Sequence, residues 1–455
     1  MRSKDITIIG AGLCGTALAI KLAQRGYKVN LFEKRPDLRK VTQDAGRSIN
    51  LALSDRGLKA LRLIGLEEKA LKMCIPMKGR MIHNLNKPSF LSQYSGRNHE
   101  YINSISRPGL NALLLGASET YPNISLNFNT TCTAIDTQTN TASFYNQDTQ
   151  KEQTITNITL FGTDGAGSVV RRALQTQHPN TFKTTTSWLT HGYKELEIPS
   201  TTKKGFAIEK EALHIWPRGG HMLIALPNLD GSFTVTLFAP LKGPTYSFEA
   251  LTTPEHVLAY FKTFYPSAYK VMPDLLPTFF ENNTGTLGTV RCNPWHHKNR
   301  IMLMGDAAHA IVPFYGQGMN ASLEDVVVFD EILEKHNENL TDAFIEFSAN
   351  RKKDTDAIAD LALDNFEEMK AHTADPLFQQ KRKLEIAFET QFPQIYFSKY
   401  SKVTFQEQLP YSQALKEGRA QDKAILSLLK AGQLPDTLPI KEALKKVQTA
   451  TTLYL

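Results

Sequence analysis

The spacing of apolar positions divides the chain into segments of different period. Ile6–Ile9 and Lys28–Phe32 are short apolar runs of strand character, separated by a helix-compatible segment that ends near Arg25. From about residue 180 to 285, apolar and polar positions alternate strongly between Pro and Gly positions, which indicates an antiparallel sheet. Residues 341–455 have mostly helical periodicity, interrupted by prolines.

This pattern predicts an α/β fold with an inserted antiparallel sheet and a helical C-terminal region. We expect a Rossmann-type nucleotide domain to comprise residues 1–178 and 286–340, with residues 75–103 crossing to the substrate side. Residues 179–285 are predicted to form a substrate-binding β-sheet domain, and residues 341–455 the C-terminal helices.

The first predicted strand runs into the turn Gly10-Ala11-Gly12-Leu13-Cys14-Gly15, and Glu33 follows the second strand. In a dinucleotide-binding βαβ unit, Gly10 makes the tight turn and Gly12 lets a pyrophosphate approach the backbone, while Gly15 allows close helix–strand packing. Glu33 can then accept hydrogen bonds from a ribose. Arg35 either contacts the adenine or a phosphate or lies in a solvated loop, and the sequence leaves both readings open.

Two further Gly-Asp turns follow predicted strands far along the chain, at Thr163-Asp164-Gly165 and at Gly305-Asp306. Either aspartate alone can be explained as the cap of a following helix. Ligands of an open α/β sheet bind at the carboxyl ends of its strands, so these turns and the first glycine turn together favour a long dinucleotide.

Composition and charge exclude several other classes of protein. The 455 residues are 41% apolar and 21% charged, and 52 Lys and Arg against 45 Asp and Glu give a net charge of +7. No basic, aromatic-interleaved patch indicates nucleic-acid binding, so the charge is expected to attract small anions. The four cysteines, at positions 14, 74, 132 and 292, lack metal-ligand spacing, which predicts free thiols, no metal and a reducing compartment.

The N-terminus enters its first predicted strand within about five residues and leaves no room for a signal peptide. No apolar run reaches roughly 18 residues, the length that a transmembrane helix needs. We therefore expect a cytoplasmic protein without a membrane span.

The order of the glycine and aspartate turns resembles that of the group A flavoprotein monooxygenases over residues 1 to about 330. The resemblance implies bound FAD, with the first glycine turn at the pyrophosphate, Glu33 at the adenosine ribose and Asp306 at the ribityl chain. It also implies that Asp164 serves both FAD and NADPH, and that the helix starting near Gly316 points its amides at the flavin pyrimidine edge. The cofactor-binding residues expected in this way are Gly10, Gly12, Gly15, Glu33, Arg35, Arg107, Asp164, Asp306, Gly316, Gln317, Gly318, Met319 and Asn320.

A narrower resemblance, to the kynurenine 3-monooxygenase family, spans nearly the whole chain. It rests on Gly79-Arg80-Met81, the run Pro313–Asn320, the run Asn365–Met369 and the run Tyr400–Phe405. In this family Arg80 and Tyr94 would hold a substrate α-carboxylate, Asn365 and Tyr400 would meet its polar end, and Phe314 and Met369 would flank its ring. The substrate-binding residues implied are Arg80, Tyr94, Phe314, Asn365, Met369 and Tyr400.

The reaction implied by this resemblance is NADPH- and O₂-dependent hydroxylation of L-kynurenine to 3-hydroxy-L-kynurenine through a flavin C4a-hydroperoxide. The ring amine of kynurenine activates its own ring, so we expect no catalytic general base, and His309 is predicted to be a structural histidine. Two departures stand out. Position 315 is Tyr where the family commonly has another aromatic residue or His, and residues 431–455 are too polar for the membrane anchor of eukaryotic members.

Two other functions remain open from the residues themselves. The chain can be a group A flavin hydroxylase of another aromatic acid, of the salicylate or hydroxybenzoate type. It can also be a non-catalytic FAD-binding redox protein that uses its C-terminal helices as a docking surface. Without the family, Arg80 in a β segment is more often a surface residue or an ion-pair partner.

Overall fold

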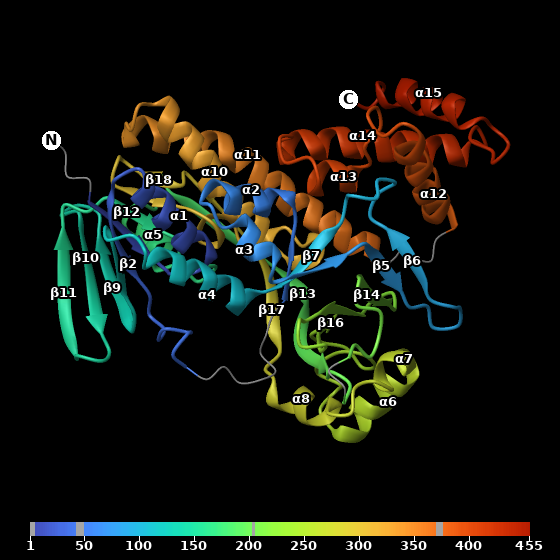
Figure 1. The fold of residues 1–455 in the computed structure, drawn as a ribbon, viewed down its shortest axis with the longest axis horizontal. Coiled ribbons are helices and arrows are strands. Elements are labelled where there is room, and N and C mark those ends of the chain that lie inside the picture. The colour runs from blue at the N-terminus through green and yellow to red at the C-terminus, as the bar shows by residue number, and fades with distance from the viewer. Residues whose placement is uncertain (1–4, 42–49, 203–204, 370–375) are drawn as a thin grey trace.

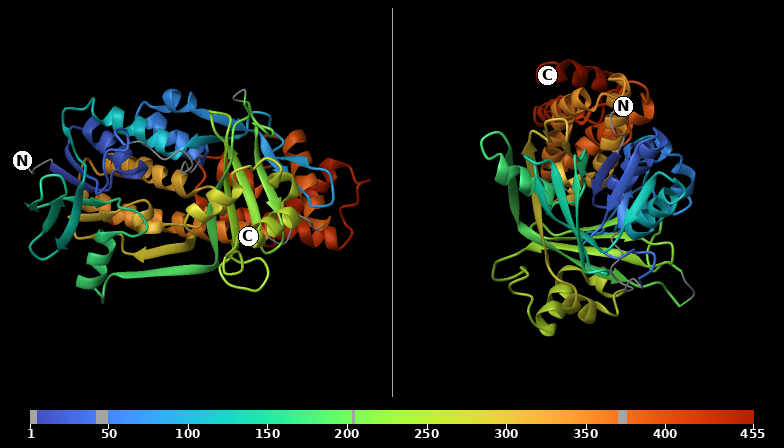
Figure 2. Two further views of the ribbon diagram at one scale, coloured as in Figure 1. Left: turned by 90° about the horizontal axis from the view of Figure 1, so that it is seen from below. Right: turned by 90° about the vertical axis from the view of Figure 1, so that its left-hand side faces the viewer.

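Strands far apart in the sequence assemble into four sheets in the part of the chain that the structure, a computed structural model, describes (Figure 1). The described residues are 5–41, 50–202, 205–369 and 376–455. The C-terminal helices lie at the opposite end of the molecule from a small sheet of residues 130–156 (Figure 2).

The central element of the nucleotide side is a six-stranded sheet in the order β18-β19-β12-β1-β2-β8. Its strands are β1 (Asp5–Ile9), β2 (Lys28–Phe32), β8 (Ile124–Asn127), β12 (Leu160–Gly162), β18 (His296–His297) and β19 (Ile301–Leu303). β1 pairs in parallel with both β2 and β12, and only the edge strand β18 runs antiparallel within this sheet. Both faces are covered, which explains why β1 is a continuous apolar run rather than an alternating one.

Helices cover one face of this sheet and a β-meander covers the other. The helices are α1 (Leu13–Gln24), α4 (Arg107–Ser118) and α10 (Gly318–Lys335), and the meander consists of β9 (Thr130–Asp136), β10 (Thr141–Asn146) and β11 (Lys151–Thr156). Phe144 of the meander stacks on Phe32 of β2, with the ring centroids 4.0 Å apart. The two layers therefore share one hydrophobic core with the sheet.

A seven-stranded sheet, in the order β17-β13-β16-β15-β14-β5-β6, forms the second half of the molecule. Its strands are β5 (Gly79–Ile82), β6 (Phe90–Gln93), β13 (Lys183–Ile198), β14 (Ala212–Pro217), β15 (Met222–Pro227), β16 (Phe233–Pro240) and β17 (Gly285–Asn293). The pairs from β13 to β17 are antiparallel, whereas β14 pairs in parallel with β5. β5 and β6 thus bring a segment from early in the chain onto the edge of this sheet.

Small elements connect the two halves. β3 (Asn50–Leu53), β7 (Ile102–Ser106) and β4 (Cys74–Met77) form a three-stranded antiparallel sheet. The remaining short helices are α2 (Asp55–Leu63), α3 (Glu67–Leu71), α5 (Val169–Gln177), α9 (Asp306–His309) and the 3₁₀ turn η1 (Pro313–Tyr315).

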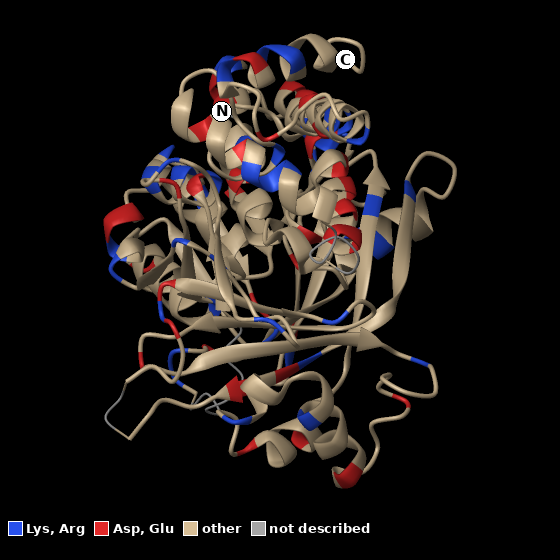
Figure 3. Ribbon diagram, turned by 90° about the vertical axis from the view of Figure 1, so that its right-hand side faces the viewer, with Lys and Arg blue, Asp and Glu red and all other residues tan. Residues whose placement is uncertain are grey.

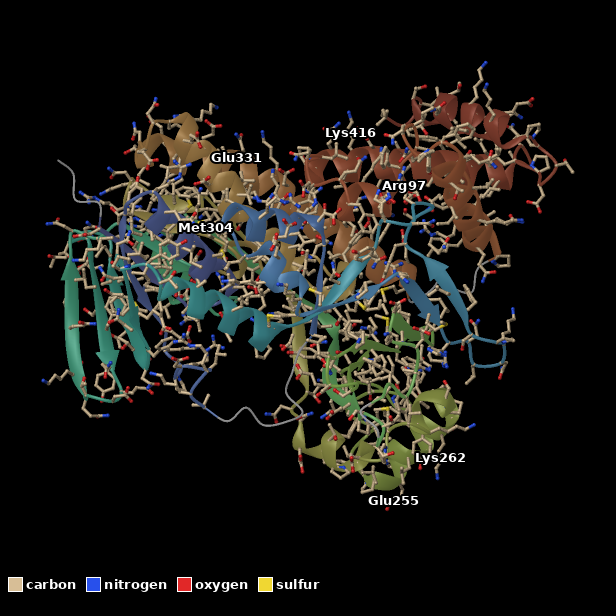
Figure 4. The ribbon with its side chains drawn as sticks, in the orientation of Figure 1. Arg97, Glu255, Lys262, Met304, Glu331 and Lys416 are labelled. Carbon is tan, nitrogen blue, oxygen red and sulfur yellow. The ribbon has the colours of Figure 1, made fainter. Side chains whose placement is uncertain are left out.

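The C-terminal region is helical, from α11 (Leu340–Glu367) through α12 (Pro376–Gln391), α13 (Lys399–Thr404), α14 (Tyr411–Lys430) and α15 (Ile440–Thr451). Acidic and basic residues are interspersed over these helices (Figure 3). Arg97, in the loop after β6, donates to the carbonyl oxygens of Pro393 and Tyr396 at 2.7 and 2.5 Å, which anchors the helices to the sheet side (Figure 4). None of the described helices combines the length and apolar character needed to cross a membrane.

The predicted fold class is confirmed, and the structure differs from the sequence expectation in detail. Within the segment expected to be an antiparallel sheet, the structure forms α6 (Pro254–Phe264), α7 (Pro266–Tyr269) and α8 (Leu275–Glu281). Val257, Tyr260 and Phe261 follow helical rather than strand spacing, and they pack with the sheet residues in a separate core.

Candidate active site

The first glycine turn lies between β1 and α1, and its glycines are required for steric reasons. Gly10 has φ +101°, and a Cβ there would lie 2.6 Å from the carbonyl oxygen of Thr163. A Cβ on Gly15 would lie 2.1 Å from the carbonyl oxygen of Gly10, whereas a Cβ on Gly12 would meet nothing within 4 Å. Among the residues that the structure describes, no side chain caps helix α1, so its first amides are available to a phosphate.

The Glu33 carboxylate is buried at the end of β2 and closes back onto this turn. It accepts hydrogen bonds from the Ala11 amide at 3.0 Å and from the Arg35 Nε at 2.7 Å. The Arg35 side chain is 63% exposed. Glu33 and Arg35 line a small cavity of about 190 Å³, so the two side chains expected to contact the ribose and the adenine lie at one location.

The two carboxylate oxygens of Asp164, which follows the end of β12, have different surroundings. Oδ2 accepts from the Val169 amide at 2.6 Å, so this oxygen caps helix α5. Oδ1 is buried and has no hydrogen-bond partner among the described residues. Burial raises the pKa of Asp164, and the hydrogen bonds of Ser168 and Val169 oppose that effect. An unpartnered buried acceptor beside the glycine turn is suited to a ligand that donates a hydrogen bond.

Asp306 begins helix α9 directly after the strained turn at Gly305, where φ is +60°. Its Oδ1 accepts a long hydrogen bond, 3.4 Å, from the Ser322 hydroxyl. His309, on the same short helix, is buried and lies 2.6 Å from Asp325 through its Nε2 atom. His309 is therefore engaged by a buried carboxylate, as a structural histidine would be.

Helix α10 starts where a flavin-facing helix was expected. Gly316 has φ +70°, and among the described residues no side chain caps the helix. Asn320 donates to the Ala52 carbonyl at 2.8 Å and accepts from the Ser54 amide at 2.9 Å, while Gln317 accepts from the Tyr411 hydroxyl at 2.9 Å. These hydrogen bonds to residues outside α10 hold the start of the helix in place. The backbone amides of Gly318, Met319 and Asn320 remain available to donate hydrogen bonds to a ligand.

Together these loops fit FAD. The open turn at Gly12, the free Asp164 oxygen and the uncapped start of α10 are arranged along one sheet edge. Arg107 is the first residue of α4 and its side chain is exposed.

A larger cavity of about 530 Å³ lies between the seven-stranded sheet and the C-terminal helices. Its walls come from β5 and β6, η1, the end of α11, α12 and the start of α13. This volume is in the usual range of small-molecule sites. Five of the six expected substrate residues line it, namely Arg80, Tyr94, Asn365, Met369 and Tyr400, and Phe314 does not.

Arg80 lies among three tyrosines in this cavity. Its guanidinium carbon is 4.7 Å from the ring centroid of Tyr400 and 5.5 Å from that of Tyr94. Tyr400 stacks on Tyr94 at 5.2 Å and on Tyr315 at 5.6 Å. The Tyr94 hydroxyl is buried and has no hydrogen-bond partner among the described residues. Burial raises the pKa of Tyr94 and of Tyr315 well above the usual phenol value, so both stay neutral.

The cavity charges are unequal in how they are compensated. The described residues of the lining include five cations, and four of these reach a carboxylate. Lys381 and Arg382 reach Glu385 at 3.1 and 3.4 Å, Lys383 reaches Asp436 at 3.9 Å, and Lys399 reaches Glu368 at 2.6 Å. Arg80 pairs with no carboxylate of the described chain. A half-buried guanidinium of this kind, in the wall of a cavity, is suited to an anionic ligand.

Asn365 and Phe314 are used partly within the protein. Asn365 donates to the Phe314 carbonyl at 2.6 Å and approaches the Met369 sulfur at 3.5 Å. The Phe314 ring stacks on Phe366 at 4.2 Å and is not in the cavity lining, where the adjacent Tyr315 takes its place.

Sequence reasoning missed the charged residues of α12 and α13 that line the cavity. Lys381, Arg382 and Glu385 follow ordinary i, i+4 charge spacing, which is typical of a solvated helix face. Their burial depends on packing against β6 and α14, and no local pattern reports that. Glu368 lies within the run Asn365–Met369, in which only Asn365 and Met369 are expected from the sequence to bind substrate.

Comparison with known proteins gives consistent results. A family model described as an FAD binding domain matches residues 3–338. The kynurenine 3-monooxygenase of Myxococcus xanthus is 42% identical over 454 residues, which cover 100% of this chain and 97% of the relative. The kynurenine 3-monooxygenase of Dictyostelium discoideum is 44% identical over 440 residues, 94% of each chain.

Solved structures share the fold at much lower identity. A 2-methyl-3-hydroxypyridine-5-carboxylic acid oxygenase matches with a TM-score of 0.65 and 20% identity, covering 87% of this chain and 99% of its own. The p-nitrophenol 4-monooxygenase PnpA from Pseudomonas putida DLL-E4 matches with a TM-score of 0.67 and 15% identity, covering 90% and 99%. At these identities the likeness establishes the fold alone.

Proposed function

Since the chain belongs to the kynurenine 3-monooxygenase family, we propose that it is an FAD-dependent monooxygenase that converts L-kynurenine to 3-hydroxy-L-kynurenine with NADPH and O₂. The observation that carries this proposal is Arg80, a half-buried guanidinium without a carboxylate partner in the described chain, which lines a cavity of about 530 Å³. The carboxylate of an amino acid can pair with such a fork through two parallel hydrogen bonds.

The glycine and aspartate turns hold FAD in this proposal. The amides of α1 bind the pyrophosphate, Glu33 binds the adenosine ribose and Asp306 binds the ribityl chain. The uncapped start of α10 presents its positive end to the flavin pyrimidine edge. FAD, when bound, supplies the two-electron chemistry that activates O₂ at the expense of NADPH.

The substrate cavity acts by placement and by exclusion of water. Arg80 and Tyr94 bind the α-carboxylate, so the unpartnered Tyr94 hydroxyl gains an acceptor. Tyr400 and Met369 border the substrate, and Asn365 fixes the η1 backbone beside it. The buried tyrosines remain protonated, because burial raises their pKa, so none serves as a base at neutral pH. Kynurenine needs none, because its ring amine already enriches the ring.

Purified protein reconstituted with FAD tests the function directly. We expect a yellow protein whose NADPH oxidation is stimulated by L-kynurenine, with 3-hydroxy-L-kynurenine identified by mass spectrometry. Stimulation by salicylate or 4-hydroxybenzoate and none by kynurenine would make the protein a hydroxylase of another aromatic acid. Slow NADPH use that no substrate changes would instead indicate a redox-binding role.

We also propose that the protein is cytoplasmic. Cys14, Cys74, Cys132 and Cys292 are all free thiols, and three of them are buried, which suits a reducing compartment. Cell fractionation with an antibody against the chain tests this location.

A further inference from the structure

The cavity lining contains an acidic group that the proposed substrate contacts do not use. Glu368 follows the last residue of α11 and lines the cavity next to Met369. Its side chain is 24% exposed, and Lys399 pairs with it at 2.6 Å. Asn365 lies one helical turn earlier, so Glu368 is on the same wall as the residues expected to meet the substrate.

Two carboxylates line the cavity among the residues that the structure describes, and they differ in how many cations pair with them. Glu385 is 3% exposed and shared by Lys381 and Arg382, at 3.1 and 3.4 Å. Among the described residues Glu368 has Lys399 as its cation, and Lys399 in turn also reaches Asp422 at 2.6 Å. Lys399 therefore keeps a second carboxylate when Glu368 takes a further donor. Glu368 is the lining acid that has acceptor capacity to spare.

Arg80 and Glu368 belong to the same part of the cavity. Both side chains line it, and the guanidinium carbon of Arg80 lies 4.7 Å from the ring centroid of Tyr400. Lys399, the residue before Tyr400, pairs with Glu368 at 2.6 Å, so Glu368 is held beside the same start of α13. A free cation and an under-used carboxylate near one aromatic residue match the two opposite charges of an α-amino acid.

We propose that Glu368 binds the α-ammonium group of the substrate while Arg80 binds its α-carboxylate, so that Glu368 selects amino acids over plain aromatic acids. This assignment rests on the proposed function. An aromatic acid without an amine would neutralise Arg80 equally well, yet it would give Glu368 no new partner. The cavity would then bind such an acid without the contribution of one charge-assisted hydrogen bond.

The test compares two substrates on the FAD-loaded protein, L-kynurenine and its analogue lacking the α-amine, 4-(2-aminophenyl)-4-oxobutanoate. For the wild type, kcat/KM should favour kynurenine by about 10- to 100-fold, the value of one hydrogen bond to a charged group. In Glu368→Gln, kcat/KM for kynurenine should fall by about the same factor through KM, while the analogue changes by less than about threefold. Isothermal titration of both compounds should give the same ratio.

Glu367→Gln is the matched control, since Glu367 is the adjacent and exposed acid. This variant should leave kcat/KM unchanged for both kynurenine and the analogue. Equal losses for both substrates in Glu368→Gln would overturn the proposal, as would no loss for either. If Glu368→Gln fails to fold or to retain FAD, the wild-type ratio decides alone, because equal wild-type affinity for both compounds excludes an ammonium contact. Absence of any hydroxylated kynurenine from the wild type would refute the proposed function instead.

Discussion

Replacing Arg80 with alanine removes a lining cation that pairs with no carboxylate of the described chain. Because no ion pair among the described residues is broken, we expect the free energy of unfolding to change by less than about 1 kcal/mol. The Tyr94 and Tyr400 rings lose only a stacking partner. The effect should therefore fall on the ligand that supplies the missing negative charge.

The size of that effect follows from the burial of the pair. Truncating one partner of a buried, hydrogen-bonded charge pair costs about 2 to 5 kcal/mol, which corresponds to about a 30- to 4,000-fold loss in affinity. We expect kcat/KM for L-kynurenine to fall within this range in Arg80→Ala, mainly through KM, with FAD content unchanged. Arg80→Lys should recover only part of the loss, since an ammonium cannot form the forked pair.

Steady-state kinetics with kynurenine, together with the visible spectrum of the bound flavin, measures both quantities. Lys383→Ala is the control, because Lys383 also lines the cavity but its side chain and that of its partner Asp436 are 76% and 83% exposed. Screened surface pairs contribute little, so this variant should stay within about threefold of the wild type. A KM for kynurenine that is unchanged in Arg80→Ala would remove Arg80 from the substrate site.

Three further predictions concern the cofactor side and the sheet. Gly15→Ala places a Cβ 2.1 Å from a backbone oxygen of the first glycine turn, so this variant should not retain FAD. Gly116→Ala is the control, because a Cβ there would meet open space, and it should leave FAD bound. Equal FAD content in the two purified variants would contradict the role of the turn. Tyr411→Phe removes the hydroxyl that donates to Gln317 at 2.9 Å, and it should weaken FAD binding by up to about tenfold in a fluorescence titration. An unchanged FAD affinity would show that other contacts hold the start of α10. Burial lowers the pKa of His221 to about 4, so between about pH 6.5 and 4 the unfolded chain binds a proton that the folded chain excludes. The stability from neutral His221 is therefore fully present above about pH 6.5 and is lost as the pH falls towards 4, by up to roughly 3 kcal/mol. Thermal melts over this pH range should show a flatter slope of stability against pH for His221→Phe than for the wild type.

Local patterns predicted the nucleotide-binding elements well. The strand, helix and second strand at the start of the chain were expected at nearly the observed bounds, because each element there follows from a short apolar run and a glycine turn. The expected sheet around residues 180–285 was less accurate. Its last part forms α6 to α8, whose apolar residues pack under the sheet at helical spacing. The roles of the individual site residues remain predictions that the variants above test.

The substrate cavity could not be assembled from local patterns. Its lining comes from segments near residues 80, 94, 315, 368, 385 and 400, and each segment alone has an ordinary explanation. The sequence shows that Arg80 lies in a predicted β segment, but it does not show which charged residues Arg80 can pair with. Only the fold shows that the neighbouring cations are paired and that Arg80 is not, within the described chain.

Long-range ion pairs decide how the C-terminal helices should be interpreted. Arg56 on α2 is 1% exposed; it pairs with Glu324 of α10 at 2.6 Å and donates to the carbonyl oxygens of Val403 and Gln406, at 2.7 and 3.1 Å. This guanidinium therefore joins the helix that starts at the flavin site to the end of α13, whose first turn carries Tyr400.

A separate docking module would not need such a connection. Charges buried between segments about 270 and 350 positions apart are stable only when all partners stay in place, since removing one partner typically costs about 3 to 5 kcal/mol. The C-terminal helices are thus held rigidly against the nucleotide domain, and α12 and α13 form walls of the substrate cavity. This arrangement favours an enzyme whose C-terminal region completes the active site over a redox-binding protein that uses the same helices to recruit a partner.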